Sequence, residues 1–275
     1  MMKYTYNSSA KTIFLILTLV ILAWVTTVAE AQLLKDTFDD PAWEERWEIH
    51  DDGTSGIPSV WSVGGGIPED SFGTTSQILN GIGPSGADEM TGTYALTLKA
   101  GSESWSDYIF SCDLYHAGDN DYAGLMVRYA DELNYVRVWS KQAEIDSGDV
   151  TTFGMDICVS GKWTFHYKLG GPGPGGDGIS GTPIPAGDNI TMMAWFNITV
   201  EAVGDTVTMY MEGEEMGSIT DPALVPGGEL AKGKIALFNT TNPTAYDNVL
   251  VSAQAVSSAG KLGTTWGILK AGYEQ

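Results

Sequence analysis

The stretch that decides the fold is YAGLMVRYADELNYVRVWS, residues 122–140. Leu125 and Val127 occupy alternate positions in Ala123–Tyr129, and Val136 and Val138 do so in Tyr135–Ser140. A period of two residues is typical of strands that turn one face towards a core and the other face away from it. Acidic and Asn residues between the two runs favour a turn. The stretch therefore predicts two strands of one sheet.

Similar runs recur along the chain, separated by clusters of Gly, Asp, Asn and Pro. They are Tyr94–Lys99, Tyr108–Tyr115, Thr152–Val159, Trp163–Leu169, Phe196–Val203, Thr206–Glu212, Lys234–Phe238 and Ala245–Ser252. Gly204-Asp205 is a signal for a tight hairpin, and no helical period of useful length follows residue 31. The sequence predicts an all-β chain, a two-sheet antiparallel jelly-roll sandwich of about ten to fourteen strands.

The segment Gly170–Gly187 is rich in Gly and Pro and predicts a long loop. A linker between two domains is the competing interpretation. We favour the loop because Trp163–Leu169 and Phe196–Val203, on either side of it, have the patterns of neighbouring strands in one sheet. We therefore predict one sandwich domain over residues 32–253, followed by a flexible C-terminal tail over residues 254–275.

Residues 1–31 have the features of a secretory signal peptide. Lys3 and Lys11 precede an uncharged run, and Ala29-Glu30-Ala31 has the small-x-small pattern of a cleavage site. The uncharged run is shorter than a membrane-spanning helix needs. We predict a secreted or otherwise extracytoplasmic protein, in the periplasm or at the cell surface, with no membrane insertion after cleavage. An uncleaved N-terminal anchor is the alternative.

The charge balance narrows the range of partners. The 275 residues include 14 Lys and Arg against 35 Asp and Glu, a formal net charge of −21. Sequence-independent binding to nucleic acid needs a basic patch, so the composition argues against a nucleic-acid partner. With only 2 Cys, the chain is neither a disulfide-stapled mini-protein nor the holder of an all-Cys zinc site.

The order of segments resembles that of concanavalin A-like, laminin-G-like jelly-roll domains. The resemblance rests on DTFDD (residues 36–40), YAGLMVRY (122–129), NYVRV (134–138), WFNITVE (195–201), YMEG (210–213), GKIAL (233–237) and YDNVLV (246–251). It covers roughly residues 33–253. Bacterial relatives of this type include sugar-binding modules, family-16 glycoside hydrolases and 3-keto-disaccharide hydrolase-like domains. Such a diffuse pattern implies a fold more strongly than a function.

The resemblance suggests one weak catalytic candidate. Family-16 enzymes carry their carboxylates on one strand as Glu-x-Asp-x-(x)-Glu, and Glu144 and Asp146 begin such a motif. Asp149 then stands where a second Glu belongs, and Ser147-Gly148 predicts a turn that would break the shared face. A polar hairpin loop is the favoured interpretation, and a catalytic pair flanking a glycosidic bond is the alternative.

The resemblance also implies a structural calcium ion. Relatives often hold Ca²⁺ between an early Asp and the Asp of the final strand, and Asp39, Asp40 and Asp247 match those positions. Carboxylates and carbonyls are the oxygen ligands that Ca²⁺ takes. Ordinary turn and capping carboxylates are the alternative.

The pairing of the two cysteines is left open. Cys112 shares an apolar strand face with Phe110 and Leu114, whereas Cys158 points away from the apolar face that carries Ile157. Side chains on opposite faces do not meet the geometry of a disulfide without a bulge. Export, on the other hand, favours a disulfide.

Alternation along the strands also locates a candidate ligand groove. Val127, Val136 and Val138 are predicted to face the core, which leaves the intervening side chains on one exposed sheet face. The residues predicted for this face are Arg128, Tyr135, Arg137, Trp139, His166 and Lys168. Aromatic rings with a few planar hydrogen-bonding groups are typical of sugar sites. The alternative is a solvated sheet with cross-strand charge pairs to acids such as Asp113 or Asp156.

Taken together, these features predict an exported module that binds carbohydrate or another extracellular partner without catalysis. A glycoside hydrolase-like enzyme that acts on a polysaccharide through groove carboxylates is the alternative. A structural or adhesive surface module is a third interpretation.

Overall fold

The computed structural model describes residues 31–51, 58–64, 71–74, 92–116, 122–141, 152–169, 194–240 and 243–254. Most of the predicted signal peptide, the Gly/Pro-rich loop and the predicted tail lie outside these ranges, so the predictions about them stay predictions. Within the described ranges, no helix is long and apolar enough to cross a membrane.

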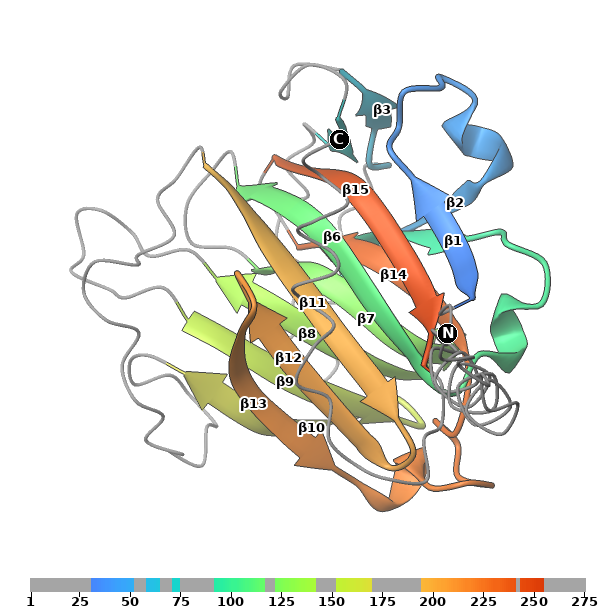
Figure 1. Cartoon of the computed structure of the whole chain (residues 1–275), viewed down its shortest axis with the longest axis vertical. Helices are drawn as coiled ribbons and strands as arrows, with labels where there is room; N and C mark the ends of the chain where they lie inside the picture. Colours follow the sequence, from blue (N-terminus) through green and yellow to red (C-terminus); the bar gives the residue numbers. More distant parts are fainter. Residues whose placement is uncertain are drawn as a thin grey trace, which may run out of the picture. The chain divides into compact units, whose positions relative to one another are not determined.

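The described strands form two antiparallel sheets. One is eight-stranded, with the order β13-β12-β11-β6-β15-β4-β3 and with β1 paired to β15. Its strands are β1 (Gln32–Asp36), β3 (Trp61–Val63), β4 (Phe72–Thr74), β6 (Tyr108–His116), β11 (Trp195–Val203), β12 (Thr206–Met211), β13 (Glu214–Thr220) and β15 (Thr244–Ala253). In Figure 1 this sheet lies in front of the other.

The second sheet is seven-stranded, with the order β10-β9-β8-β7-β14-β5-β2. Its strands are β2 (Trp47–Asp51), β5 (Thr93–Thr97), β7 (Tyr122–Asp131), β8 (Asn134–Lys141), β9 (Thr152–Val159), β10 (Lys162–Leu169) and β14 (Lys234–Asn239). Short 3-10 turns, η1 (Trp43–Glu45), η2 (Ser102–Ser104) and η3 (Pro222–Leu224), lie between strands. The prediction of an all-β, two-sheet antiparallel sandwich is confirmed.

All ten predicted runs are strands, but one predicted neighbourhood is wrong. We expected Trp163–Leu169 and Phe196–Val203 to pair in one sheet, whereas β10 belongs to the seven-stranded sheet and β11 to the eight-stranded one. The pattern along a strand reports which side is buried, and it carries no information on which sheet the strand joins. The predicted Gly204-Asp205 turn does connect β11 to β12, and Gly204 adopts the left-handed φ of 58° that such turns favour.

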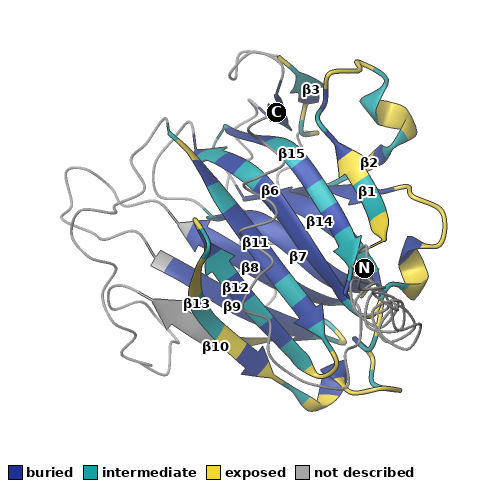
Figure 2. Cartoon of the chain, in the orientation of Figure 1, coloured by how far each residue is buried: buried dark blue, intermediate teal, exposed yellow. Residues whose placement is uncertain are grey.

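The main core lies between the sheets and is made by the inward faces of both. Phe196, Ile198 and Val200 of β11 come from one sheet, and Val136 and Val138 of β8 come from the other. All five side chains are buried. Figure 2 shows that burial is most complete along the central strands and falls off towards β1, β2 and β13.

Hydrogen bonds inside this core link one sheet to the other. The His116 Nε2 and Ser140 Oγ atoms lie 2.8 Å apart. The Tyr108 hydroxyl of β6 accepts from the backbone N–H of Arg128 at 2.9 Å. Buried polar groups need such partners, and these partners come from strands of opposite sheets, so the bonds help to hold the two sheets in one relative register.

Candidate functional site

The predicted groove corresponds to the side of the seven-stranded sheet that faces away from the core. We call it the outer aromatic face. Its buried members are Tyr94, Leu96, Met126, Tyr129, Tyr135, Trp139, Cys158, Ala236 and Phe238, and Tyr122 and Trp163 pack against them. Tyr135 and Trp139 thus point to one side of β8 and Val136 and Val138 to the other, as alternation along the strand predicts.

The predicted exposure of this face is wrong. Tyr135, Arg137 and Trp139 are only 1%, 2% and 3% exposed. The rings cover one another: Tyr129 stacks on Tyr135 with centroids 6.0 Å apart, and Tyr122 meets Trp139 edge to face at 4.6 Å. Aromatic side chains bury large areas, so a row of them forms a second apolar cluster on a face that alternation alone marks as outward.

Arg137 is bound to a carboxylate on the neighbouring strand. Its Nε and Nη2 atoms donate to Asp156 Oδ2 at 3.0 and 2.6 Å, and Trp139 Nε1 donates to the same oxygen at 2.8 Å. The guanidinium also lies 4.4 Å from the centroid of the Trp163 ring. The cross-strand pairing with Asp156, which was the alternative interpretation, is therefore the arrangement that the structure contains. The role of Arg137 in the structure is that of a buried ion-pair partner of Asp156.

Arg128 lies elsewhere, which corrects its assignment to the exposed face. The pairing of β7 with β8 shifts register between Val127 and Asp131, and Arg128 has a φ of 53°. Its side chain is 1% exposed, and its guanidinium donates to the carbonyls of Leu230, Ala231 and Gly204 at 3.0, 2.6 and 3.2 Å. Arg128 therefore holds loops together at one end of the strands.

The remaining predicted site residues are less informative. His166 and Lys168 lie on β10, where a register shift between Phe165 and Tyr167 interrupts the alternation, and their side chains are outside the described part of the structure. Glu144 and Asp146 lie outside the described residues altogether. Their proposed catalytic role stays a prediction.

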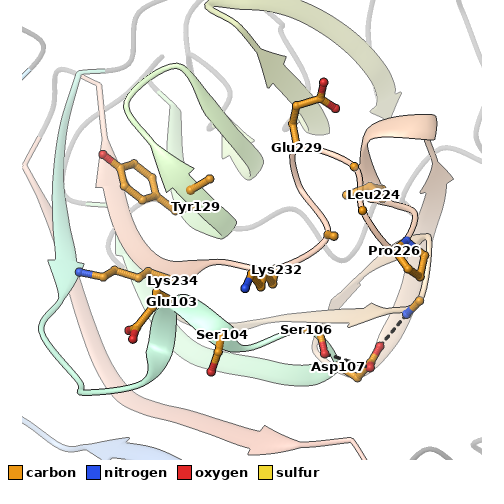
Figure 3. Close-up of a pocket in the computed structure, with 15 residues that line it drawn as sticks. Glu103, Ser104, Ser106, Asp107, Tyr129, Leu224, Pro226, Glu229, Lys232 and Lys234 are labelled. Carbon is orange, nitrogen blue, oxygen red and sulfur yellow. Dashed lines mark hydrogen bonds between the residues drawn. The ribbon is translucent and has the colours of Figure 1, made fainter.

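A pocket of about 710 Å³ opens beside Arg128, and we call it the end pocket (Figure 3). Its walls come from η2, the β11–β12 turn and the segment after η3. The polar and aromatic lining residues are Glu103, Ser104, Ser106, Asp107, Tyr129, Glu229, Lys232 and Lys234. Tyr129 also belongs to the outer aromatic face, and Lys234 is its cross-strand partner. The end pocket therefore lies where this face ends.

Local geometry shapes the wall after η3. Asp221 caps η3 by accepting from the Ala223 N–H at 2.8 Å. Gly227 has a φ of 91°, and a Cβ on Gly228 would lie 2.3 Å from the Ala223 carbonyl oxygen. Only glycine fits that approach. Elsewhere in the lining, Asp107 Oδ1 accepts from the Gly204 N–H at 2.7 Å and fixes the β11–β12 turn.

The electrostatics of the end pocket are mixed. Two lysines, Lys232 and Lys234, share the lining with three carboxylates, those of Glu103, Asp107 and Glu229. Neither lysine makes an ion pair within the described part of the chain. Burial raises the pKa of Tyr129 above its usual value, and its hydroxyl lies 2.8 Å from that of Tyr94. The tyrosine stays neutral, and the pocket offers hydroxyl, ammonium and carboxylate groups together.

Sequence reasoning missed the end pocket. Its residues come from four separate segments, and no motif joins them. One signal was present: Lys232-Gly-Lys234 is a local concentration of cations in a strongly acidic chain. A concentration of this kind in a turn-rich segment points to a site, although it does not say which other residues complete it.

The three predicted calcium ligands have partners of their own. Asp39 accepts from the Thr37 hydroxyl at 2.6 Å, and Asp40 accepts from the Ala42 N–H at 2.9 Å. Among the described residues, no group of three or more His, Cys, Asp or Glu side chains is arranged to hold a metal ion. Calcium binding by Asp39, Asp40 and Asp247 remains a prediction.

The early Asp that does organise this region is Asp36. It is buried, and its Oδ2 atom accepts from Arg46 Nε at 2.7 Å and from Trp47 Nε1 at 2.8 Å. Its Oδ1 atom accepts from the Phe38 N–H. The first acid of the DTFDD segment therefore joins β1 to β2 through structural contacts.

The two cysteines are free and buried. Cys112 lies in the core between the sheets, and Cys158 lies in the outer aromatic face. Burial raises the pKa of both thiols, that of Cys158 to about 11. Cys112 thus points into the core and Cys158 points away from it, as alternation predicts. These opposite directions keep the two sulfur atoms apart.

Comparison with solved structures identifies the fold. The GH43 protein BlXynB from Bacillus licheniformis superposes with a TM-score of 0.51 at 13% identity, over 80% of this chain and 39% of that one. The Bacteroides ovatus xyloglucan PUL GH43B gives 0.50 at 14%, over 83% and 41%. A Bacillus subtilis protein of unknown function with a galectin-like fold gives 0.51 at 10%, over 82% and 98%.

The chain has a concanavalin A-like jelly-roll fold. It spans about two fifths of the length of the two GH43 proteins. No protein-family model matches the sequence. No curated protein matches it either. At these identities the likeness describes the fold, and function has to be argued from the sites.

Proposed function

We propose that the protein is an exported carbohydrate-binding module without catalysis, and that the end pocket holds part of a neutral sugar chain. The observation that carries this proposal is the lining of the pocket. It combines the ring of Tyr129 with Ser hydroxyls, ammonium groups and carboxylates at the end of an aromatic sheet face. Its volume of about 710 Å³ lies within the usual range for small-ligand sites.

The charges favour a neutral ligand over an ionised one. Two ammonium groups and three carboxylates line the pocket, so the local charge is close to balanced, whereas the chain carries −21. The overall field repels polyanions. Sugar hydroxyls can donate to carboxylates and accept from ammonium groups, so a polyol uses both kinds of group at once.

Binding to soluble polysaccharides tests the proposal directly. Xyloglucan, the polysaccharide named in one of the structural relatives, is the first probe, with arabinoxylan, galactan and dextran beside it in affinity gel electrophoresis and calorimetry. Lys234→Ala and Glu103→Ala should each weaken binding about tenfold, because a hydrogen bond to a charged group contributes about 1.5–3 kcal/mol. Lys35→Ala is the matched control, since Lys35 is exposed on β1 and is not among the residues that line the end pocket. Equal binding by all four proteins would count against the end pocket.

The enzyme alternative has a separate test. If Glu144 and Asp146 form a catalytic pair, the wild-type protein should release reducing sugar from a polysaccharide that it binds. Glu144→Gln should then abolish this release without weakening binding. Binding without release supports the module.

We also propose that Asp39, Asp40 and Asp247 hold a structural calcium ion, as the resemblance implies. The proposal is supported by the raised pKa of Asp247, which has burial as its main cause and the nearby carboxylates of Asp113, Asp39 and Asp36 as further causes. Added Ca²⁺ should raise the melting temperature of the chelator-treated wild type by mass action and leave Asp247→Asn unchanged. Identical melting of the wild type with Ca²⁺ and with chelator would rule out a stabilising ion.

A further inference from the structure

An aromatic pair lies on the outer side of the eight-stranded sheet, away from the end pocket. Tyr115 of β6 and Trp195 of β11 are direct cross-strand partners, and their ring centroids are 5.3 Å apart. Trp195 is 40% exposed. Among the described residues, the other exposed large apolar side chains are all aliphatic. An exposed tryptophan supported by a second ring is a preformed apolar platform.

A polar network begins next to these rings. Asp113 is two residues before Tyr115 on β6, so both side chains lie on the same face. Asp113 Oδ1 accepts from Asn197 Nδ2 at 2.9 Å, and its Oδ2 accepts from Asn248 Nδ2 at 2.8 Å. Asn197 in turn accepts from the Thr199 hydroxyl at 2.9 Å. The carboxylate and both amides are therefore held in defined orientations.

Two carboxylates oppose each other in this network. Asp247 of β15 is the direct cross-strand partner of Asp113. Like charges directly opposite on neighbouring strands are destabilising. The cost of this opposition at Asp113 is offset where a ligand supplies hydrogen-bond donors to its carboxylate.

We propose that this surface is a second carbohydrate-binding site, in which Trp195 stacks on a sugar ring and Asp113 accepts hydrogen bonds from its hydroxyl groups. We call it the sheet platform; its residues are Asp113, Tyr115, Trp195, Asn197, Asp247 and Asn248. Positions two residues apart on a strand are about 6.6 Å apart. One sugar ring with its hydroxyl groups can therefore contact the aromatic pair and Asp113 together.

The charge of the platform defines the ligand class. It presents carboxylates and amides without a Lys or Arg among its six residues, so an acidic glycan is excluded and a neutral one is suited. The inference goes beyond the end pocket, because Trp195 begins β11 whereas the end pocket includes Gly204, just past the other end of that strand. A chain with both sites would bind two equivalents of a short oligosaccharide.

The test is a calorimetric titration with xyloglucan-derived and xylan-derived oligosaccharides. The wild type should bind two equivalents. Trp195→Ala should lose one of them, with at least about a tenfold drop in affinity at that site. Trp195→Phe, which keeps an aromatic ring, should retain part of the affinity at that site. Leu133→Ala is the matched control, since Leu133 is 51% exposed on the turn between β7 and β8.

The outcomes separate the two sites. Unchanged stoichiometry and affinity in Trp195→Ala would overturn the sheet platform and leave the end pocket standing. If Trp195→Ala lost all binding while Lys234→Ala bound as the wild type does, the end pocket would be overturned and the platform supported. Conversion of a dimer to a monomer by Trp195→Ala, with sugar binding unchanged, would show an interface between copies and overturn the proposal. Absence of wild-type binding to every probe would overturn both sites.

Discussion

At the level of single side chains, Asp156 binds two of the residues predicted for an open groove. Its Oδ2 atom accepts from both Arg137 and Trp139, and its side chain is fully buried. Burying a charge away from water is costly, and the pairing of Arg137 with Asp156 offsets part of that cost inside the aromatic face. The pattern along β8 indicated the direction of these side chains, and the partner on β9 decided their role.

Removal of Asp156 should therefore be strongly destabilising. Asp156→Ala leaves the Arg137 guanidinium buried without its carboxylate, and we expect a loss of about 3–5 kcal/mol in the free energy of unfolding. Urea denaturation measures it. The double variant Arg137→Met with Asp156→Leu should recover a large part of the loss, because apolar side chains replace both charges. A loss below about 1 kcal/mol in Asp156→Ala would show that the ion pair is solvated.

Asp247 should destabilise the protein at neutral pH. Its pKa in the folded protein, about 6, lies above the ordinary value of 3.8. The folded state therefore favours the protonated carboxyl: this contribution to stability is fully present below pH 3.8 and is lost as the pH rises through 6. In chelator, Asp247→Asn should raise the free energy of unfolding at pH 7 by about 1 kcal/mol, allowing for solvent screening. The gain should shrink at pH 4. Glu214→Gln, at an exposed position on β13, is the control.

At the level of strands, β7 contains two departures from regular geometry. Gly124 lies opposite Trp139 of β8, and Arg128 lies in a bulge four residues later. A Cβ on Gly124 would lie 2.1 Å from the Val138 carbonyl oxygen and 2.8 Å from the Trp139 Cα. The glycine lets the two strand backbones approach, and the bulge redirects Arg128 from the aromatic face to the loops.

Gly124→Ala should therefore separate β7 from β8. We expect a loss of about 3 kcal/mol or more in the free energy of unfolding, because backbone atoms have to move. Gly204→Ala is the comparison, since a Cβ there meets nothing within 4 Å and only its φ of 58° is unfavourable. That variant should lose about 1–2 kcal/mol. Equal losses in the two variants would contradict the close approach at Gly124.

At the level of the whole molecule, His116 joins the two sheets through Ser140. It is fully buried, and burial lowers its pKa from 6.5 to about 4. The neutral ring is the form that the sandwich accommodates. Its contribution to stability is present above pH 6.5 and is lost as the pH falls from 6.5 to 4, because the unfolded chain binds a proton that the folded chain does not.

The wild type should lose about 3 kcal/mol from this residue between pH 6.5 and pH 4. His116→Gln keeps a polar side chain and removes the titration. The difference in unfolding free energy between the two proteins should therefore narrow as the pH falls across this window. Guanidinium denaturation at several pH values measures it. A difference independent of pH would show that His116 titrates normally in the folded protein.

Several features of the fold could be predicted because they are local. Val136 and Val138 alternate with Tyr135 and Trp139, so a period of two residues in the sequence identifies the two faces of β8. Five strands, β1, β2, β3, β4 and β13, were missed because they are short or, as in Glu214–Thr220, mostly polar. The end pocket was missed because Glu103, Tyr129 and Lys234 meet only after the chain has folded.

The sequence by itself determined that this chain is an antiparallel β-sandwich and which side chains of β7 and β8 face its core. The tertiary structure alone decided that β10 and β11 belong to different sheets, that Arg128 leaves its strand face, and that Tyr135, Arg137 and Trp139 are covered. Alternation is a property of one strand and can be read along the chain. Burial of the second face depends on neighbours distant in sequence, such as Asp156 and Phe238, which only the assembled sheet brings together.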